Sequence, residues 1–151
     1  MSQPQQPISQ RARLYQQFSA ALLAGELDVA EAMIATDVFV AKLPGGPGLP
    51  WHLFIMEFAR RIAPFSNFGQ QVDMLAIVEG GGKLFSHYRM TVTNDRPLTL
   101  WKSTKTIQPS NKTFTMECVD IVTFGPDDKI VSIDSITDRL DNLVHMGIPR
   151  E

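Results

Sequence analysis

The spacing of apolar residues changes once along the chain, close to Gly69. Before Gly69, apolar residues recur every three or four positions, as on one face of an amphipathic helix, whereas after it they alternate with polar residues, as in a half-buried strand. A strand over residues 38–43 and a Gly- and Pro-rich loop over residues 43–50 interrupt the helical part. The helical part predicts three helices, over residues 9–24, 28–35 and 51–63.

The alternating part predicts strands that are joined by short turns. Clusters of Gly, Pro, Asn and Asp mark these turns. The predicted strands cover residues 70–79, 83–93, 98–107, 113–124 and 129–137, and a short final helix is expected over residues 139–146. Because strands joined by short turns pair as hairpins, the sheet should be antiparallel. Helices that precede an antiparallel sheet predict an α+β fold with the helices packed on one face.

The composition is that of one ordinary globular domain. The chain has 151 residues, of which 44% are hydrophobic and 20% are charged, so it is long enough to bury a core without disulfides or metal. Residues 1–8 are expected to form a flexible tail and residues 9–151 a single domain. The single cysteine, Cys118, excludes an intramolecular disulfide and a zinc site built from several cysteines.

Charge and hydropathy indicate which kinds of partner and which cellular compartment to expect. The net charge is −2 and no basic patch stands out, which disfavours nucleic-acid binding. No apolar run is long enough to cross a bilayer, and the first ten residues lack the apolar segment of a secretory signal. We therefore expect a cytoplasmic protein that has neither a membrane nor a nucleic acid as its partner.

Asp120 is the strongest candidate for a functional residue. Alternation along residues 113–124 places it on an otherwise apolar strand face. Burial without a partner is costly for a carboxylate, so Asp120 should either accept hydrogen bonds or keep a proton near neutral pH. A neutral carboxylic acid can donate a hydrogen bond to a developing oxyanion. The other interpretation is a structural carboxylate, satisfied by a backbone N–H or by a tyrosine hydroxyl.

Tyr88 and Lys42 are the other candidate catalytic residues. Tyr88 shares a strand face with Leu84 and Met90, and on an internal face its hydroxyl would reach Asp120 or a ligand carbonyl. Lys42 lies near the end of the first strand. In the interior its pKa would fall, and its amine could act as a base or a Schiff-base nucleophile. At the strand end it would instead reach solvent, and a third interpretation is an ion pair with Asp120.

Further residues are expected to line a pocket for a small molecule. Ser135 and Thr137 would add polar groups to a mostly apolar wall. The expected wall residues are Phe18, Trp51, Phe54, Met116, Cys118, Ile133, Ser135 and Thr137. Trp51 and Phe54 are interpreted equally well as core residues. The three histidines show no metal-ligand spacing, so we expect neither a metal nor a cofactor.

Three segments carry a resemblance to a known fold family. They are residues 25–37 with the strand and loop that follow, the strand–turn–strand VDIVTFGPDDKIVSID over residues 119–134, and the tail DRLDNLVHMGIP over residues 138–149. These segments resemble the nuclear-transport-factor-2-like superfamily, in particular its SnoaL-like polyketide cyclases and ketosteroid isomerases. The resemblance implies a cone-shaped α+β fold, in which three N-terminal helices pack on a strongly curved, mainly antiparallel sheet of five to six strands.

The resemblance also implies roles for individual residues. Asp120 matches the protonated aspartate that donates to the oxyanion in ketosteroid isomerases. Lys42 stands where those enzymes have their general base, and Phe18 stands where they have a tyrosine on the first helix. Ser135 stands where cyclases and epoxide hydrolases carry an aspartate on the last strand. The machinery of the known enzymes is therefore incomplete in this chain.

These residues lead to three hypotheses on function. The first is a cofactor-free enzyme that binds an apolar, carbonyl-bearing compound in the cone and catalyses isomerisation, cyclisation or dehydration by acid–base chemistry. The second is a non-catalytic binding protein with the same cone, which the departures at Lys42 and Ser135 favour. The third is a protein-interaction module. The resemblance further implies a homodimer through the open sheet face, with Trp101 as an anchor.

Overall fold

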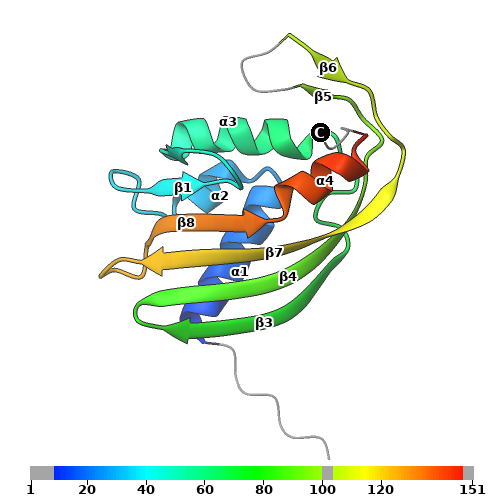
Figure 1. The fold of residues 1–151 in the computed structure, drawn as a ribbon. Helices are drawn as coiled ribbons and strands as arrows, with labels where there is room; N and C mark the ends of the chain where they lie inside the picture. The colour runs from blue at the N-terminus through cyan, green and yellow to red at the C-terminus, as the bar shows by residue number, and fades with distance from the viewer. Residues whose placement is uncertain (1–8, 100–103, 148–151) are drawn as a thin grey trace, which may run out of the picture.

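The computed structural model describes residues 9–99 and 104–147, so the predicted tail and Trp101 lie outside the described residues. Figure 1 shows the order of the elements along the chain. They are α1 (Gln10–Leu23), α2 (Leu27–Glu31), β1 (Val40–Lys42), β2 (Gly48–Leu49), α3 (Trp51–Ile62), β3 (Val72–Gly80), β4 (Lys83–Thr93), β5 (Leu98–Thr99), β6 (Thr106–Ile107), β7 (Thr113–Phe124), β8 (Ile130–Thr137) and α4 (Arg139–His145).

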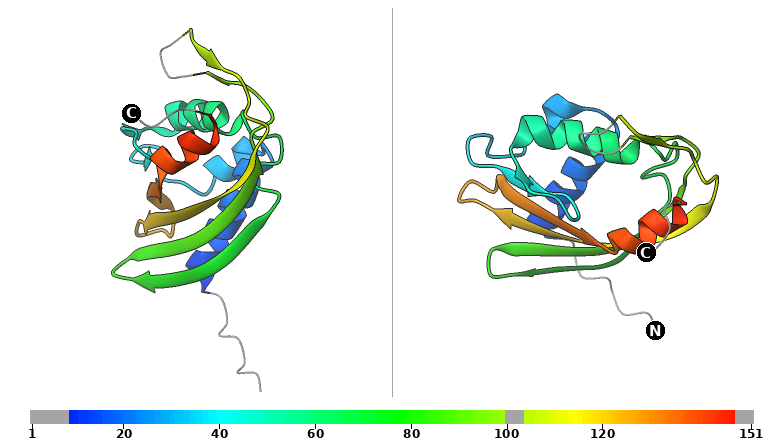
Figure 2. Two further views of the ribbon diagram at one scale, coloured as in Figure 1. Left: turned by 45° about the vertical axis from the view of Figure 1, so that its right-hand side comes forward. Right: turned by 45° about the horizontal axis from the view of Figure 1, so that its top comes forward.

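Six strands form one curved sheet in the order β2-β1-β8-β7-β4-β3. The β1–β8 pair is parallel, and the other neighbours in this sheet are antiparallel. The long strands β4 and β7 bend around the helices, with α1 against one face of the sheet and α3 above it (Figures 1 and 2). The predicted α+β class with a curved, mainly antiparallel sheet is confirmed.

A capping serine and glycines with positive φ mark the ends of several of these elements. The Ser9 side chain accepts a hydrogen bond from the backbone N of Ala12 at 3.1 Å and so caps the start of α1. Gly25 follows the end of α1 with φ of +75°, a conformation that costs glycine little. Gly81 and Gly82 have φ of +61° and +76°, which allows the two-residue turn between β3 and β4.

The single strand predicted over residues 98–107 is wrong. The segment contains two short strands, β5 and β6, which pair with each other and not with the main sheet. Leu98 lies opposite Ile107, and Thr99 lies opposite Thr106. Alternation cannot distinguish one strand from two strands joined by a reversal, and no Gly, Pro, Asn or Asp marks a turn between Thr99 and Thr106.

Two other segments differ from the prediction in extent. The second helix ends at Glu31 instead of Ala35, because the chain then runs alongside β8, and the Ala35 backbone N donates to the Ile130 carbonyl at 2.9 Å. The loop over residues 43–50 contains β2, which pairs antiparallel with β1 and adds a sixth strand to the sheet.

The interior consists of two apolar clusters that meet along β7. One cluster includes Phe18 of α1 and Val122 of β7, and the other includes Met116 of β7 and Met146 beside α4. Asp120 lies on the same strand face, between Val122 and Met116. The sheet therefore places one carboxyl group where the two clusters meet. No helix among the described residues is long and apolar enough to cross a membrane.

Candidate functional site

A cavity of about 510 Å³ lies between the helices and the inner face of the sheet. Apolar side chains from helices and strands line it, including Phe18 of α1, Phe54 of α3, Met90 of β4 and Met116 of β7. Leu143 of α4 closes part of its wall. This volume falls within the range of roughly 300–1,000 Å³ that is usual for small-molecule sites.

Strand pairing places a polar row across the inner face of the sheet. Asp120 on β7 pairs with Ser86 on β4 and with Ser135 on β8, so these three residues form the row. The neighbouring row is the apolar set Leu84, Val122 and Ile133. Because directly paired residues share a face, the register alone brings Ser135 to Asp120.

Three hydroxyl groups converge on the Asp120 carboxylate, which is only 7% exposed. Tyr15 Oη donates to Oδ2, and Ser135 Oγ donates to Oδ1 over 2.7 Å. Tyr88 Oη lies 3.4 Å from Oδ1 and 3.3 Å from Oδ2, so its one proton is shared between both oxygens. The Tyr88 contacts are longer than the usual O–H···O distance of about 2.7–2.8 Å, which makes this hydroxyl the most weakly held of the three.

Burial and hydrogen bonding act in opposite directions on Asp120. Removal from water raises the pKa of the carboxyl, whereas hydrogen bonds from Tyr15, Ser135 and Tyr88 lower it, and the net effect is a raised pKa. Burial also raises the pKa of Tyr15 and Tyr88, and the nearby Asp120 charge adds to both. Both phenols therefore stay protonated and act as donors.

In this arrangement one lone-pair position of the Asp120 carboxylate remains open to a proton from a ligand. A carboxylate has about four lone-pair positions, and three hydroxyl protons reach Asp120. A raised pKa also makes the carboxylate a stronger base than a solvated one. A ligand proton delivered from the cavity side would meet this base beside the Tyr88 hydroxyl.

Tyr15 is the site residue that the sequence reasoning missed. The resemblance assigned the tyrosine position of the first helix to Phe18, but the hydroxyl comes from Tyr15, three residues earlier. Ala12, Tyr15, Phe18 and Ala21 form the buried stripe of α1. The spacing of three residues could have placed Tyr15 on the buried face of α1. A buried tyrosine needs a hydrogen-bond partner for its hydroxyl, so this spacing was a signal for a polar contact in the interior.

Most of the expected pocket residues do line the cavity. Tyr88 and Asp120 face it, and so do the expected wall residues Phe18, Phe54, Met116, Cys118, Ile133, Ser135 and Thr137. Cys118 is mostly buried beside Tyr88 and Thr137, and burial raises the pKa of its thiol. The site is thus assembled from β4, β7 and β8 together with α1 and α3.

Lys42 does not line the cavity and is exposed, so of its three interpretations the solvent-reaching one fits its position. In β1 only the central residue, Ala41, is buried. Val38 and Val40, which share the face of Lys42, are 62% and 44% exposed. Pairing with β8 places Ala41 beside Ile133 of the inner face and Lys42 beside Asp134 of the outer face. Lys42 therefore has no contact with Asp120.

Trp51 lies in the core and does not line the cavity. Its ring packs against those of Phe18, Phe39 and Phe54, with centroid separations of 6.2, 5.8 and 5.9 Å. At 8% exposure it holds α3 against α1. Of its two interpretations, the core position therefore fits the structure.

The three histidines lie apart from Asp120. His87 is on the outer sheet face, where its Nε2 lies 2.6 Å from Oε1 of Glu117. His145 stacks on Phe114 with ring centroids 4.9 Å apart, and His52 is exposed at the start of α3. Within residues 9–99 and 104–147, His, Cys, Asp and Glu side chains nowhere gather in a group of three or more that could hold a metal.

Comparison with known proteins yields a family match and a shared fold. A model of the SnoaL-like domain family matches residues 15–133. No curated protein matches the chain significantly in sequence. The chain is similar in structure to a proposed SnoaL-like polyketide cyclase from Jannaschia sp. CCS1, with a TM-score of 0.78 and 17% identity over 99% of this chain and 100% of that one.

Two Streptomyces proteins share the same fold. One is IdmH from Streptomyces antibioticus, a proposed polyketide cyclase, with a TM-score of 0.68 and 19% identity over 93% of this chain and all of that one. The other is AclR from Streptomyces galilaeus, a proposed hydroxylase, with a TM-score of 0.71 and 15% identity over 96% of this chain and 86% of that one. Proteins of this fold are thus named for different reactions.

Proposed function

Because this chain belongs to the SnoaL-like domain family, we propose that it is an enzyme that binds a largely apolar carbonyl compound in its cavity and moves a proton with Asp120. The reaction would be an isomerisation, cyclisation or dehydration. The proposal is supported by one observation above all. Among the residues that the structure describes, one carboxyl group lies in the wall of a mostly apolar cavity, with a weakly held tyrosine hydroxyl beside it.

In the proposed mechanism Asp120 acts first as a base. Its carboxylate takes a proton from the carbon next to the ligand carbonyl, and the electron pair of that C–H bond moves to the carbonyl oxygen. Tyr88 turns from its long contacts with Asp120 and donates to the enolate oxygen that forms. Tyr15 and Ser135 remain on the carboxylate and keep it oriented.

The fate of the enolate then decides the reaction. Return of the proton from Asp120 to a different carbon gives an isomer. Attack of the enolate carbon on a second carbonyl of the same molecule forms a ring, and Asp120 returns the proton to the new alkoxide. Loss of a hydroxide from the neighbouring carbon, assisted by the same proton, gives an alkene and water.

The step common to all three reactions can be tested without the natural substrate. The bicyclic ketone 2-tetralone exchanges its α-protons in D₂O, and the exchange is followed by proton NMR. We expect the protein to accelerate this exchange and Asp120→Asn to lower the acceleration by about a hundredfold or more, as is usual for the loss of a general base. The matched control is Asp134→Asn, since Asp134 of β8 pairs with Ile121 of β7 on the outer face and does not line the cavity.

Two outcomes would contradict the proposed catalysis. Asp120→Asn could retain the exchange rate of the wild type while circular dichroism shows an intact fold. Alternatively, the wild type could bind 2-tetralone, as ligand-observed NMR would reveal, without accelerating exchange. The second outcome supports non-catalytic binding in the same cavity. That alternative is favoured by the three hydroxyl groups that already donate hydrogen bonds to Asp120.

A further inference from the structure

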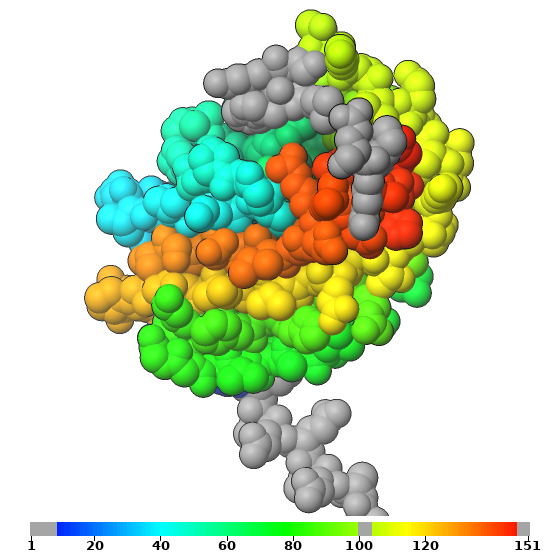
Figure 3. Space-filling model, in the orientation of Figure 1, coloured from blue at the N-terminus to red at the C-terminus, as the bar shows by residue number. Residues whose placement is uncertain are grey.

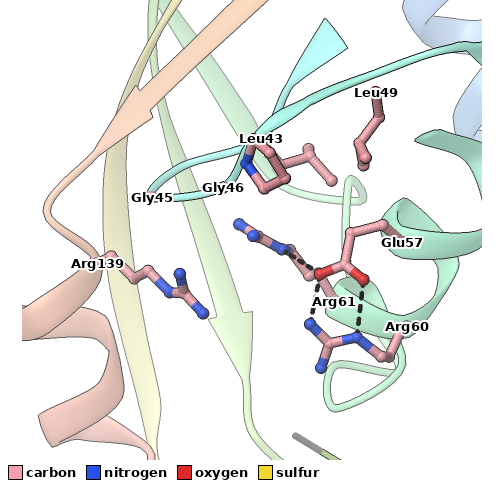
Figure 4. A pocket seen from close by; sticks show the side chains of 9 residues that line it. Leu43, Gly45, Gly46, Leu49, Glu57, Arg60, Arg61 and Arg139 are labelled. Atoms are coloured by element: carbon pink, nitrogen blue, oxygen red, sulfur yellow. Dashed lines mark hydrogen bonds and ion pairs between the residues drawn. The ribbon is translucent and has the colours of Figure 1, made fainter. Parts of the chain in front are cut away.

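A second, smaller pocket of about 160 Å³ lies beside the cavity, between the loop after β1 and the helices α3 and α4. Figure 4 shows this pocket with Glu57, Arg60 and Arg61 on α3 and with Arg139 at the start of α4. Leu43, Arg60, Arg61 and Arg139 line both the pocket and the cavity. The two spaces are therefore neighbours, and one ligand could occupy both.

Three guanidinium groups in this pocket face one carboxylate. Glu57 is only 4% exposed, and its two oxygens accept from Arg61 Nε and Arg60 Nε, each over 2.9 Å. Arg61 also donates from Nη1 to the carbonyl oxygen of Pro44 over 2.6 Å. Glu57 thus holds Arg60 and Arg61 in place, whereas among the described residues it forms no ion pair with Arg139.

Arg139 carries positive charge that the described residues do not balance. Its Nη1 donates to the Pro44 carbonyl over 3.3 Å, and no carboxylate of residues 9–99 or 104–147 lies within ion-pair distance of it. Figure 4 shows its guanidinium directed into the pocket toward Arg61. Burial and the charges of Arg61 and Arg60 lower the pKa of Arg139. A cation in the first turn of α4 is also opposed by the helix dipole.

The glycines of the loop make room for these guanidinium groups. A Cβ at Gly45 would lie 2.8 Å from Nη1 of Arg139, and a Cβ at Gly46 would lie 3.0 Å from an Nη of Arg61. Larger residues at either position would push the side chains out of the pocket. The loop therefore holds two like charges close together around a small open space.

From this arrangement we propose that the pocket binds a carboxylate on the ligand, while the apolar body of the same ligand occupies the cavity beside Asp120. A planar guanidinium matches a carboxylate with two parallel hydrogen bonds, and such charge-assisted bonds are the strong ones. The pocket volume is about five times the roughly 30 Å³ that a water molecule occupies, which suits one small anionic group. This inference rests on the proposed function, because it assumes that the cavity holds the ligand.

The test compares two probes of the same shape that differ in charge. We would measure the dissociation constants of 2-naphthoate and its neutral isostere 2-naphthamide by isothermal titration calorimetry. The wild type should bind naphthoate about tenfold more tightly than naphthamide. Arg139→Gln should remove this preference by weakening naphthoate binding alone. Arg13→Gln is the matched control, since Arg13 is exposed on α1 and lines neither space.

Other binding results would contradict either the carboxylate site alone or the cavity function as well. Equal affinity of the wild type for both probes would overturn the carboxylate site and leave the apolar cavity intact as a binding site. A preference that survives Arg139→Gln, or that disappears in Arg13→Gln, would also overturn the carboxylate site. If the wild type binds neither probe, the proposed cavity function fails and the carboxylate site fails with it.

Discussion

Asp120 is a buried acid whose behaviour depends on two opposing effects. Its surroundings exclude water, which favours the protonated form, while three hydroxyl donors favour the ionised form. The first effect is the larger, so the folded protein holds the proton to a higher pH than the unfolded chain does. This difference couples the titration of Asp120 to the stability of the fold.

We expect Asp120 to make the protein less stable as pH rises. Below about pH 4, near the pKa of aspartate in unfolded chains, both states are protonated and Asp120 carries no penalty. Above it the unfolded chain loses the proton first, so the free energy of unfolding falls until the pH passes the raised pKa of the folded state. Urea denaturation at several pH values should show Asp120→Asn gaining stability relative to the wild type over this range. A constant difference between the two proteins would refute the raised pKa.

Removing the hydroxyl of Tyr15 and removing that of Tyr88 should change the Asp120 pKa and the free energy of unfolding by different amounts. Tyr15→Phe removes the tightly held donor, so it should raise the Asp120 pKa further and lower the free energy of unfolding by about 1–3 kcal/mol. Tyr88→Phe should have smaller effects because its contacts are 3.3 Å or longer. Carbon-13 NMR titration of the Asp120 carboxyl and urea denaturation measure both effects. A larger effect from Tyr88→Phe would contradict the assigned roles.

At the scale of elements, the β3–β4 hairpin shows how a turn fixes a register. Gly81 and Gly82 form the two-residue turn, and their positive φ angles match the twist of the two strands. In the hairpin Ser86 lies opposite Ile77 and Tyr88 opposite Met74, and the pairing of β4 with β7 places Ser86 and Tyr88 on the inner face. The turn thus helps to position the site from a distance along the chain.

We expect Gly82→Ala to lower the free energy of unfolding by about 1–2 kcal/mol, the usual cost of placing a side chain in left-handed backbone. The cost should come from the backbone alone, because a Cβ at Gly82 would have no neighbour within 4 Å. Gly80→Ala is the control: Gly80 also has an open Cβ position but no positive φ. Thermal or urea denaturation of both variants gives the comparison, and equal losses would show that the φ angle is not the cause.

At the scale of the whole molecule, the outer face of the sheet carries an apolar patch. Val78, Phe85 and Ile121 pair across β3, β4 and β7, and Ile136 on β8 lies in the next row. Val78, Phe85 and Ile136 are 58%, 38% and 51% exposed. Figure 3 shows β4, β7 and β8 side by side on the near face, with no helix across them. We propose that two copies of the chain associate through this face.

The proposed dimer gives a prediction on oligomeric state. Phe85→Lys places a charge in the centre of the patch and should convert a dimeric wild type to a monomer in sedimentation velocity. Met56→Lys is the control, because Met56 is 67% exposed on α3, away from the sheet. A monomeric wild type would refute the proposal, and so would dissociation by Met56→Lys.

The sequence by itself determined the class of fold and the faces of its long strands. The change from helical spacing to alternation predicted the order of helices and strands, and alternation along β7 predicted that Asp120 faces inward. These features depend on residues close together in the chain, whose side-chain directions follow from helix and strand geometry. The same alternation grouped Tyr88 with Leu84 and Ser135 with Ile133 on one strand face each, but it left open whether those faces are internal.

Only the tertiary structure decided which distant residues meet. Tyr15 and Asp120 are separated by 105 positions and come together because α1 packs across β7. Lys42 faces outward because β1 pairs with β8 in a register that places Ala41 beside Ile133 of the inner face. Arg139 lies near Arg61 because α4 begins beside the loop after β1. Spacing along the chain carries no information on such contacts, because they arise from how whole elements pack.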